Sequence, residues 1–178
     1  MASPDSIEIN IPNYGTLRGA IDDSRQIATF LNVPYATVPE RWRPAVKPEP
    51  WTGVRDAMKQ GPICPQLAPP FSLEIFLSDD GGASKREYEL DSDEKHCLNM
   101  NITVPLESLK AGAKPIPVMT WIHGGGNFFG SNAFPLYDPC NFVQHSIQLE
   151  QPVIVVSINY RLNIFGFFTS KELEQDLK

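Results

Sequence analysis

The residues with the clearest chemical meaning form the turn His123-Gly124-Gly125-Gly126. This turn directly follows Ile116 to Ile122, a mostly apolar run that predicts a strand. Glycine has no Cβ, so the backbone can adopt unusual φ and ψ angles and its N–H groups can approach a ligand oxygen closely. Backbone N–H groups placed in this way stabilise negative charge that develops on an oxygen atom, which is the chemistry of an oxyanion hole.

Two other interpretations compete for the same turn. A dinucleotide-binding loop requires the pattern GxGxxG, but the sixth position counted from Gly124 is Phe129. Pro135 also opposes the helix that would have to follow such a loop at once. A glycine turn with a purely structural role stays open on the residues of the turn alone.

An oxyanion hole serves a nucleophile and a base, and the sequence shows neither in a recognisable motif. No GxSxG pattern, which would present a nucleophilic serine on a strained turn, occurs in the 178 residues. The histidines are His96, His123 and His145, and none has a convincing serine and carboxylate partner. His145 and Ser146 are helix neighbours whose side chains would point in different directions. We therefore expect no complete triad within this sequence.

The composition and net charge of the chain restrict the kinds of molecule that it is expected to bind. The 178 residues are 42% hydrophobic and 10% aromatic, which suits one domain with a sizeable core. A net charge of −6 and a pI near 5.0 disfavour nucleic acid and anionic membrane surfaces, which select clustered Lys and Arg. No apolar run approaches the roughly 20 residues of a membrane span. Residues 1–14 lack the pattern of a signal peptide, so the sequence as written predicts a cytoplasmic protein.

The first half of the sequence predicts several strands, followed by a segment that crosses the surface of the protein. Alternating apolar residues between Ile7 and Ala36 predict a small antiparallel meander. Prolines are frequent from Pro34 to Pro70, and they predict an ordered surface crossing held by Trp42 and Trp51. The acidic, glycine- and serine-rich stretch from Ser78 to Lys95 predicts an exposed loop.

The second half alternates strands and helices. Leu98 to Val104 predicts a strand with one buried face and one more polar face. Ile116 to Ile122 and Val153 to Ile158 are rich in Val and Ile, which is typical of central strands covered on both faces. Between them Asp138 to Gln148 predicts a helix with Phe142, Val143 and Ile147 on one side, and hence a parallel crossover. Ser170 is the expected N-cap of a final helix over Lys171 to Leu177.

Several separate segments resemble one known family and follow its order. They are FLNVPYA (30–36), PWTGVRDAMKQGPICPQ (50–66), CLNMNITVP (97–105), VMTWIHGGG (118–126) and VIVVSINYRLNIFGF (153–167). The sequence resembles the type B carboxylesterase/lipase family, which includes the cholinesterases. The resemblance implies that residues 1–178 are the N-terminal portion of a single α/β-hydrolase domain. In this α/β fold, a small antiparallel meander precedes central, mostly parallel strands with a crossover helix.

The resemblance also implies an activity and its residues. It implies a serine esterase that hydrolyses small-molecule carboxylic esters, without a cofactor or a metal ion. By position, the oxyanion donors are Gly125 and Gly126, His123 and Gly124 belong to the same loop, and Asn127, Phe128 and Phe129 are candidates for the substrate pocket. Relatives commonly carry an aromatic residue where Asn127 stands. Two of their common glycines correspond to Asn32 and Asn163, an exchange that asparagine tolerates because it adopts positive φ readily.

The family places the nucleophilic serine, the triad acid and the catalytic histidine after the segment that this sequence covers. We therefore expect the 178-residue chain alone to be inactive. We also expect Ile116 to Ile122 to form an open edge, because the strand leading to the nucleophile flanks it in the family. A non-catalytic cholinesterase-like interaction domain and a truncated gene product remain as alternatives.

The resemblance further implies a disulfide between Cys64 and Cys97, with Cys140 left over. The closed loop would stabilise the fold by about 4 kcal/mol in the chain-entropy model. A reducing cytosol would keep both thiols free, so the pairing and the cytoplasmic interpretation conflict. The sequence leaves the compartment, the oligomeric state and the preferred ester open.

Overall fold

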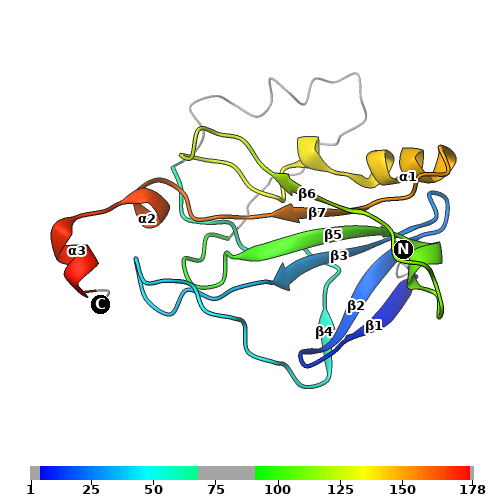
Figure 1. The fold of residues 1–178 in the computed structure, drawn as a ribbon, viewed down its shortest axis with the longest axis horizontal. Coiled ribbons are helices and arrows are strands. Elements are labelled where there is room, and N and C mark those ends of the chain that lie inside the picture. Colours follow the sequence, from blue (N-terminus) through cyan, green and yellow to red (C-terminus); the bar gives the residue numbers. More distant parts are fainter. Residues whose placement is uncertain (1–4, 68–90, 177–178) are drawn as a thin grey trace.

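A computed structural model describes residues 5–67 and 91–176 of the chain (Figure 1). Its centre is a mixed sheet with the strand order β1-β2-β3-β5-β7-β6, and β4 pairs with β2 beside this path. The strands are β1 (Ser6–Ile11), β2 (Gly15–Asp22), β3 (Ile27–Pro34), β4 (Val54–Asp56), β5 (Asn99–Pro105), β6 (Val118–Ile122) and β7 (Ile154–Ile158). The helices are α1 (Cys140–Gln148), α2 (Asn163–Phe167) and α3 (Lys171–Asp176), with 3₁₀ turns η3 (Leu106–Leu109) and η4 (Pro135–Tyr137).

The expected antiparallel meander is present as β1, β2 and β3. Its alternating side chains place Leu17 and Phe30 in one buried cluster with Val104 of β5, with exposed fractions of 0%, 1% and 3%. Burying side chains of this size contributes about 1.5–3 kcal/mol each. The meander is therefore a packed base from which β5 continues the sheet.

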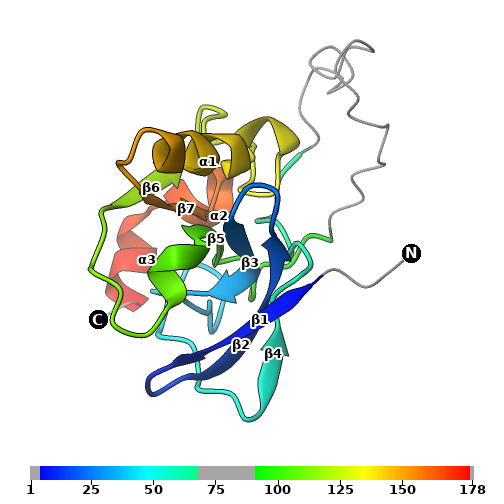
Figure 2. The same cartoon turned by 90° about the vertical axis from the view of Figure 1, so that its right-hand side faces the viewer.

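The expected parallel crossover is also present. The strands β6 and β7 pair in parallel, and α1 connects them. Figure 2 shows α1 over the β6–β7 end of the sheet, away from β1 and β2. Val143 of α1 packs with Ile27 and Val155 in a fully buried cluster. Phe142 was expected on this side but is 53% exposed, because successive helix positions lie about 100° apart and Val143 takes the inward direction.

The strand β5 differs from its expected pattern. Its polar residues Asn99, Asn101 and Thr103 are 1%, 5% and 3% exposed, whereas Met100 and Ile102 are only half-buried. The more polar face is thus the more deeply buried one. A polar face can be buried when hydrogen-bond partners are supplied, and the asparagines of β5 receive them from Gln60, Pro62 and Asn132. β5 pairs antiparallel with both β3 and β7, so parallel pairing in this sheet is confined to β6–β7 and β2–β4.

The strand β6 lies at the end of the described sheet. Its side chains at Val118, Trp121 and Ile122 are 58%, 42% and 60% exposed. The expectation of a strand covered on both faces is therefore wrong for β6 in the described part of the chain, where β7 is also the one strand that pairs with it. The expectation of an open edge, which followed from the family resemblance, is confirmed for the strands that the structure describes.

The proline-rich crossing is held by two indole groups, as expected. Trp51 Nε1 donates to the carbonyl oxygen of Thr16 at 2.9 Å, and Trp42 Nε1 donates to that of Ile164 at 2.8 Å. Ser170 caps the last helix, because its Oγ accepts the N–H of Leu173 at 3.1 Å.

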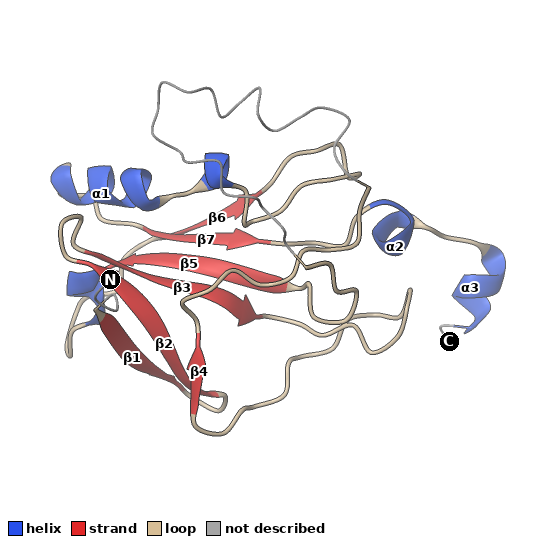
Figure 3. Cartoon of the chain, turned by 180° about the vertical axis from the view of Figure 1, so that it is seen from behind, coloured by secondary structure: helices blue, strands red, loops and turns tan. Residues whose placement is uncertain are grey.

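Figure 3 shows α2 and α3 beyond the ends toward which β6 and β7 point. None of the helices in residues 5–67 and 91–176 could span a lipid bilayer. The expected loop from Ser78 to Lys95 lies mostly outside the described residues.

The open edge predicts that the 178-residue chain associates through β6. Val118→Lys adds a charge to an exposed side chain of this strand, so it should shift the chain toward monomer in sedimentation velocity. It should change the free energy of unfolding by less than about 0.5 kcal/mol. The same substitution at Val155, a side chain 1% exposed, should unfold the chain and serves as the control. Slow amide exchange along all of β6 in a soluble wild-type monomer would contradict the prediction.

Candidate functional site

The glycine turn begins where β6 ends, and its backbone is left-handed at consecutive positions. The φ angles are +118° at Gly125, +62° at Gly126 and +67° at Asn127. The N–H of Phe128 donates to the carbonyl oxygen of Gly125 at 3.0 Å, so Gly126 and Asn127 are the central residues of a turn with two positive φ angles. Such a turn favours Gly and Asn, which suits the residues at positions 126 and 127.

The turn leaves two neighbouring backbone donors without backbone acceptors. Within the described residues, neither the N–H of Gly125 nor that of Gly126 donates to a backbone carbonyl. Gly126 is exposed and Gly125 is half-buried. Two adjacent donors without a backbone acceptor among the described residues can serve an oxygen atom of a ligand, which is what an oxyanion hole requires.

Two glycines in the loop are fixed by close approach. A Cβ built on Gly125 would overlap the carbonyl oxygen of Phe129, and one built on Gly130 would overlap the His123 ring. Gly130 also has a positive φ of +124°. Gly124 differs from both, because a Cβ there would meet open space. The loop therefore tolerates a side chain at Gly124 and excludes one at Gly125 and Gly130.

His123 anchors the start of the loop from a buried position. Its side chain is 3% exposed and stacks on Tyr160, with ring centroids 4.5 Å apart and planes 21° apart. Its Nδ1 lies 2.9 Å from the carbonyl oxygen of Gly124. A carbonyl can only accept, so we assign the proton to Nδ1. Nε2 is buried and has no partner among the described residues. Burial lowers the pKa of His123, which keeps the ring neutral.

A network of buried side-chain amides holds the far end of the loop. Asn132 is central to it: its N–H donates to Asn159 Oδ1 at 2.8 Å, and its Nδ2 donates to Asn99 Oδ1 at 3.1 Å and to the Ser157 carbonyl at 3.2 Å. Asn101 Nδ2 donates to the carbonyl oxygen of Asn132 at 3.2 Å. Sequence reasoning missed these residues, although two asparagines at alternate positions of one strand were a signal of a shared polar contact.

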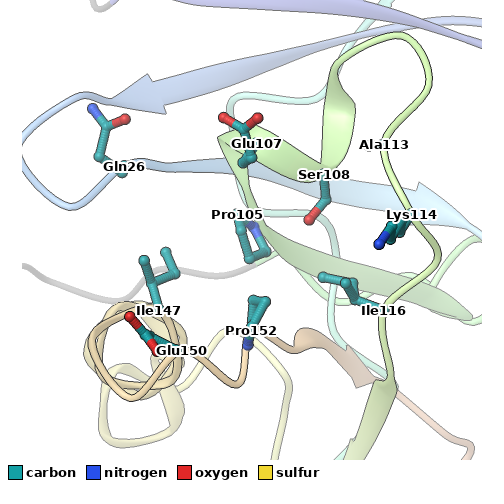
Figure 4. Close-up of a pocket in the computed structure, with 10 residues that line it drawn as sticks. All are labelled: Gln26, Pro105, Glu107, Ser108, Ala113, Lys114, Ile116, Ile147, Glu150 and Pro152. Carbon is teal, nitrogen blue, oxygen red and sulfur yellow. The ribbon is translucent and has the colours of Figure 1, made fainter.

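The candidate pocket residues lie together in the turn but differ in exposure. Phe128 is 70% exposed, Asn127 is exposed and Phe129 is half-buried. A separate cavity of about 510 Å³ lies at the other end of β6 (Figure 4). It is lined by Gln26, Pro105, Glu107, Ser108, Ala113, Lys114, Ile116, Ile147, Glu150 and Pro152. Because the glycine turn follows the carboxyl end of β6 and Ile116 precedes its amino end, this cavity belongs to a different part of the molecule.

The structure brings Cys64 and Cys97 together. Their Sγ atoms lie 2.7 Å apart as free thiols, and the residues are 1% and 0% exposed. The hydrogen bond to Cys97 and burial both raise the pKa of Cys64. Burial raises the pKa of Cys140, the half-buried first residue of α1, to about 12. No group of three or more His, Cys, Asp or Glu residues within the described ranges is arranged to hold a metal ion.

These features coincide with a known protein family. The sequence profile of the Carboxylesterase family matches residues 5–176, and the chain belongs to this family. The sheet and its helices match the corresponding part of α/β-hydrolase structures. A solved PNB esterase superimposes with a TM-score of 0.71 at 30% identity, over 94% of this chain and 30% of that one. EstA from Aspergillus niger superimposes with a TM-score of 0.70 at 25% identity, over 96% and 28%.

Relatives compared by sequence agree with this assignment. Lipase 1 of Yarrowia lipolytica is 38% identical over 154 residues, which cover 86% of this chain and 28% of the lipase. Para-nitrobenzyl esterase of Bacillus subtilis is 32% identical over 163 residues, which cover 90% of this chain and 29% of the esterase. The chain thus spans less than a third of the length of these relatives.

The neutral, buried state of His123 predicts a pH dependence of stability. The pKa of His123 is lowered in the folded state from its ordinary value of 6.5, so the unfolded state binds more protons. Stability should therefore be lost as the pH falls below about 6.5, and a His123→Gln variant should lose less of it. Urea unfolding at about one pH unit above and below this value measures the difference. His145→Gln, on an exposed position of α1, should keep the wild-type dependence. Equal pH dependence in the wild type and His123→Gln would contradict the assignment.

Proposed function

We propose that this chain supplies the oxyanion-binding loop of a serine-dependent carboxylic ester hydrolase. The observation that carries the proposal is the pair of backbone N–H groups at Gly125 and Gly126, which have no backbone acceptors within the described residues. Membership of the Carboxylesterase family supports an ester as the substrate class. The lipase and para-nitrobenzyl esterase names of the relatives support the same class.

In the proposed reaction, a serine attacks the ester carbonyl and its oxygen becomes an oxyanion. The N–H groups of Gly125 and Gly126 donate to this oxygen and bind it more tightly in the transition state than in the ester. His123 does not act as the base, because it is buried, neutral and committed through Nδ1 to Gly124. The serine, the triad acid and the catalytic histidine come from a part of the enzyme that these 178 residues do not include.

The residues after the donors are the proposed wall of the substrate pocket. Asn127, Phe128 and Phe129 follow Gly126 directly, so any group bound next to the oxyanion lies within reach of this turn. The 70% exposure of the Phe128 side chain is consistent with contact to a substrate or to the rest of the domain. An apolar acyl group suits the two phenyl rings.

A hybrid enzyme tests the proposed donors. In it, residues 5–176 replace the matching segment of Bacillus subtilis para-nitrobenzyl esterase, which keeps its own downstream residues. The hybrid should hydrolyse p-nitrophenyl butyrate, and the 178-residue chain alone should not. Gly125→Ala should lower kcat by about 10²–10³-fold, because the added methyl group would overlap the Phe129 carbonyl and so displace the Gly125 N–H from the oxyanion. Gly124→Ala, where the methyl group meets open space, should stay within about threefold.

Folding is measured separately from chemistry in the same variants. Circular dichroism reports the fold, and titration with a fluorophosphonate counts reactive serines. If Gly125→Ala does not fold, Gly126→Ala carries the test, since its methyl group has room and only the φ of +62° is strained. Full activity in Gly125→Ala would contradict the oxyanion role. A folded but inactive hybrid would favour the non-catalytic interaction domain instead.

We also propose that Cys64 and Cys97 form a disulfide, as the family resemblance implies. Their buried contact supports this pairing. Under non-reducing denaturation, the purified chain should take up one alkyl group, on Cys140, and reduction should raise the uptake to three. The Cys140→Ser variant, as the control, should take up none before reduction. Uptake of three groups without reduction would contradict the pairing.

A further inference from the structure

Gln66 makes a two-way contact with one residue at the end of the glycine turn. The N–H of Gly130 donates to Gln66 Oε1 at 2.7 Å, and Gln66 Nε2 donates to the carbonyl oxygen of Gly130 at 2.9 Å. The same Nε2 also donates to the carbonyl oxygen of Cys64 at 3.0 Å. One side-chain amide therefore satisfies both backbone groups of Gly130, as a neighbouring strand would do.

This contact reaches Gly125 through a single peptide group. The N–H of Gly130 and the carbonyl of Phe129 belong to the same planar unit, in which they point in opposite directions. By holding the N–H, Gln66 sets the orientation of the Phe129 carbonyl. That carbonyl lies so close to Gly125 that no Cβ fits between them. The position of Gly125, and with it one proposed donor, thus depends on the plane that Gln66 holds.

If the contact between Gln66 and Gly130 were lost, Gly130 would have no room to move and restore the position of the peptide group. Its other side lies against the His123 ring, where a Cβ would overlap Nδ1. The His123 ring in turn binds the Gly124 carbonyl, which shares a peptide group with the N–H of Gly125. His123 and Gln66 therefore fix the two peptide groups that lie on either side of the Gly125 contact.

The segment that carries Gln66 is itself tied to the turn from a second side. Asn163 Nδ2 donates to the Pro65 carbonyl at 3.0 Å, and the N–H of Asn163 donates to the Asn127 carbonyl at 2.7 Å. Asn163 can bridge in this way because it adopts a φ of +48°. Pro65 and Gln66 are thus held in a fixed position against the turn.

We propose that Gln66 is a positioning residue of the oxyanion loop: its amide fixes the Phe129–Gly130 peptide and thereby aligns the N–H of Gly125 for the oxyanion. This inference rests on the proposed function. It predicts that Gln66 affects the transition state more than the binding of the ester, because it acts through a donor that the oxyanion uses.

Two substitutions test this in the hybrid enzyme defined above. Gln66→Glu keeps the size and one acceptor but places carboxylate oxygens against the carbonyls of Gly130 and Cys64, and Gln66→Leu removes all three contacts. Both should lower kcat per fluorophosphonate-reactive serine by about tenfold or more, with KM within about threefold. Binding of a trifluoromethyl ketone, which forms a tetrahedral oxyanion, should weaken by the same factor as kcat/KM. Gln148→Leu and Gln148→Glu, on an exposed position of α1, are the matched controls and should change neither value.

A second measurement uses the 178-residue chain and needs no catalysis. The N–H of Phe128 is bonded to the Gly125 carbonyl inside the turn, and it makes no direct contact with Gln66. Its amide exchange should be faster in Gln66→Leu than in the wild type and unchanged in Gln148→Leu. If the wild-type hybrid is inactive, the proposed function fails and this exchange result alone decides whether Gln66 positions the turn.

Two results would overturn the inference. One is unchanged kcat per reactive serine together with unchanged exchange at Phe128. The other is a lower melting temperature and fewer reactive serines with unchanged kcat per serine, which would make Gln66 a contributor to stability alone.

Discussion

In the proposed role, the loop after β6 has to keep two adjacent backbone N–H groups free of acceptors from the described residues, and the rest of the proposed site follows from that constraint. Backbone donors in folded proteins are almost always paired, and the pairing is what usually holds a segment in place. Within the described residues, the N–H groups of Gly125 and Gly126 have no such backbone partner to hold them in place. Other hydrogen bonds replace it: the His123 ring binds at the start of the loop, the Gln66 amide and the Asn163 N–H bind along its course, and Asn159 binds Asn132 at its far end.

These anchors are all uncharged. Gln66, Asn132 and Asn163 are amides, and burial keeps His123 neutral by lowering its pKa. An amide donates and accepts at once, so it can satisfy a carbonyl and an N–H together without a counter-ion. A carboxylate in the same place would oppose negative charge on a nearby oxygen, and a buried ammonium group would need a partner of its own. A loop that binds an oxyanion through backbone dipoles is therefore best held by neutral groups.

The sequence predicted those features that depend on near neighbours. The alternating apolar residues predicted the meander, and the run of glycines predicted the turn. The tolerance of asparagine for positive φ is confirmed at Asn32 and Asn163, where φ is 55° and 48°. Features that depend on residues far apart in the sequence were either not predicted or predicted wrongly. The roles of Gln66 and Asn99 could not be predicted, because their partners in the loop lie 64 and 33 positions away. The exposure of β6 follows from its place at the sheet edge, which no local pattern specifies.

The contacts of the turn also set an order of assembly during synthesis from the amino end. The meander pairs strands that are adjacent in the chain, so it can form as soon as residues 6–34 have left the ribosome. The turn, by contrast, needs Asn159 to hold Asn132 and Asn163 to bridge Pro65 and Asn127. These two partners emerge about 30 residues or more after the glycines, so the turn lacks these two contacts until then. Of the described parts of this protein, the one with the proposed chemical role is thus among the last to take its final shape.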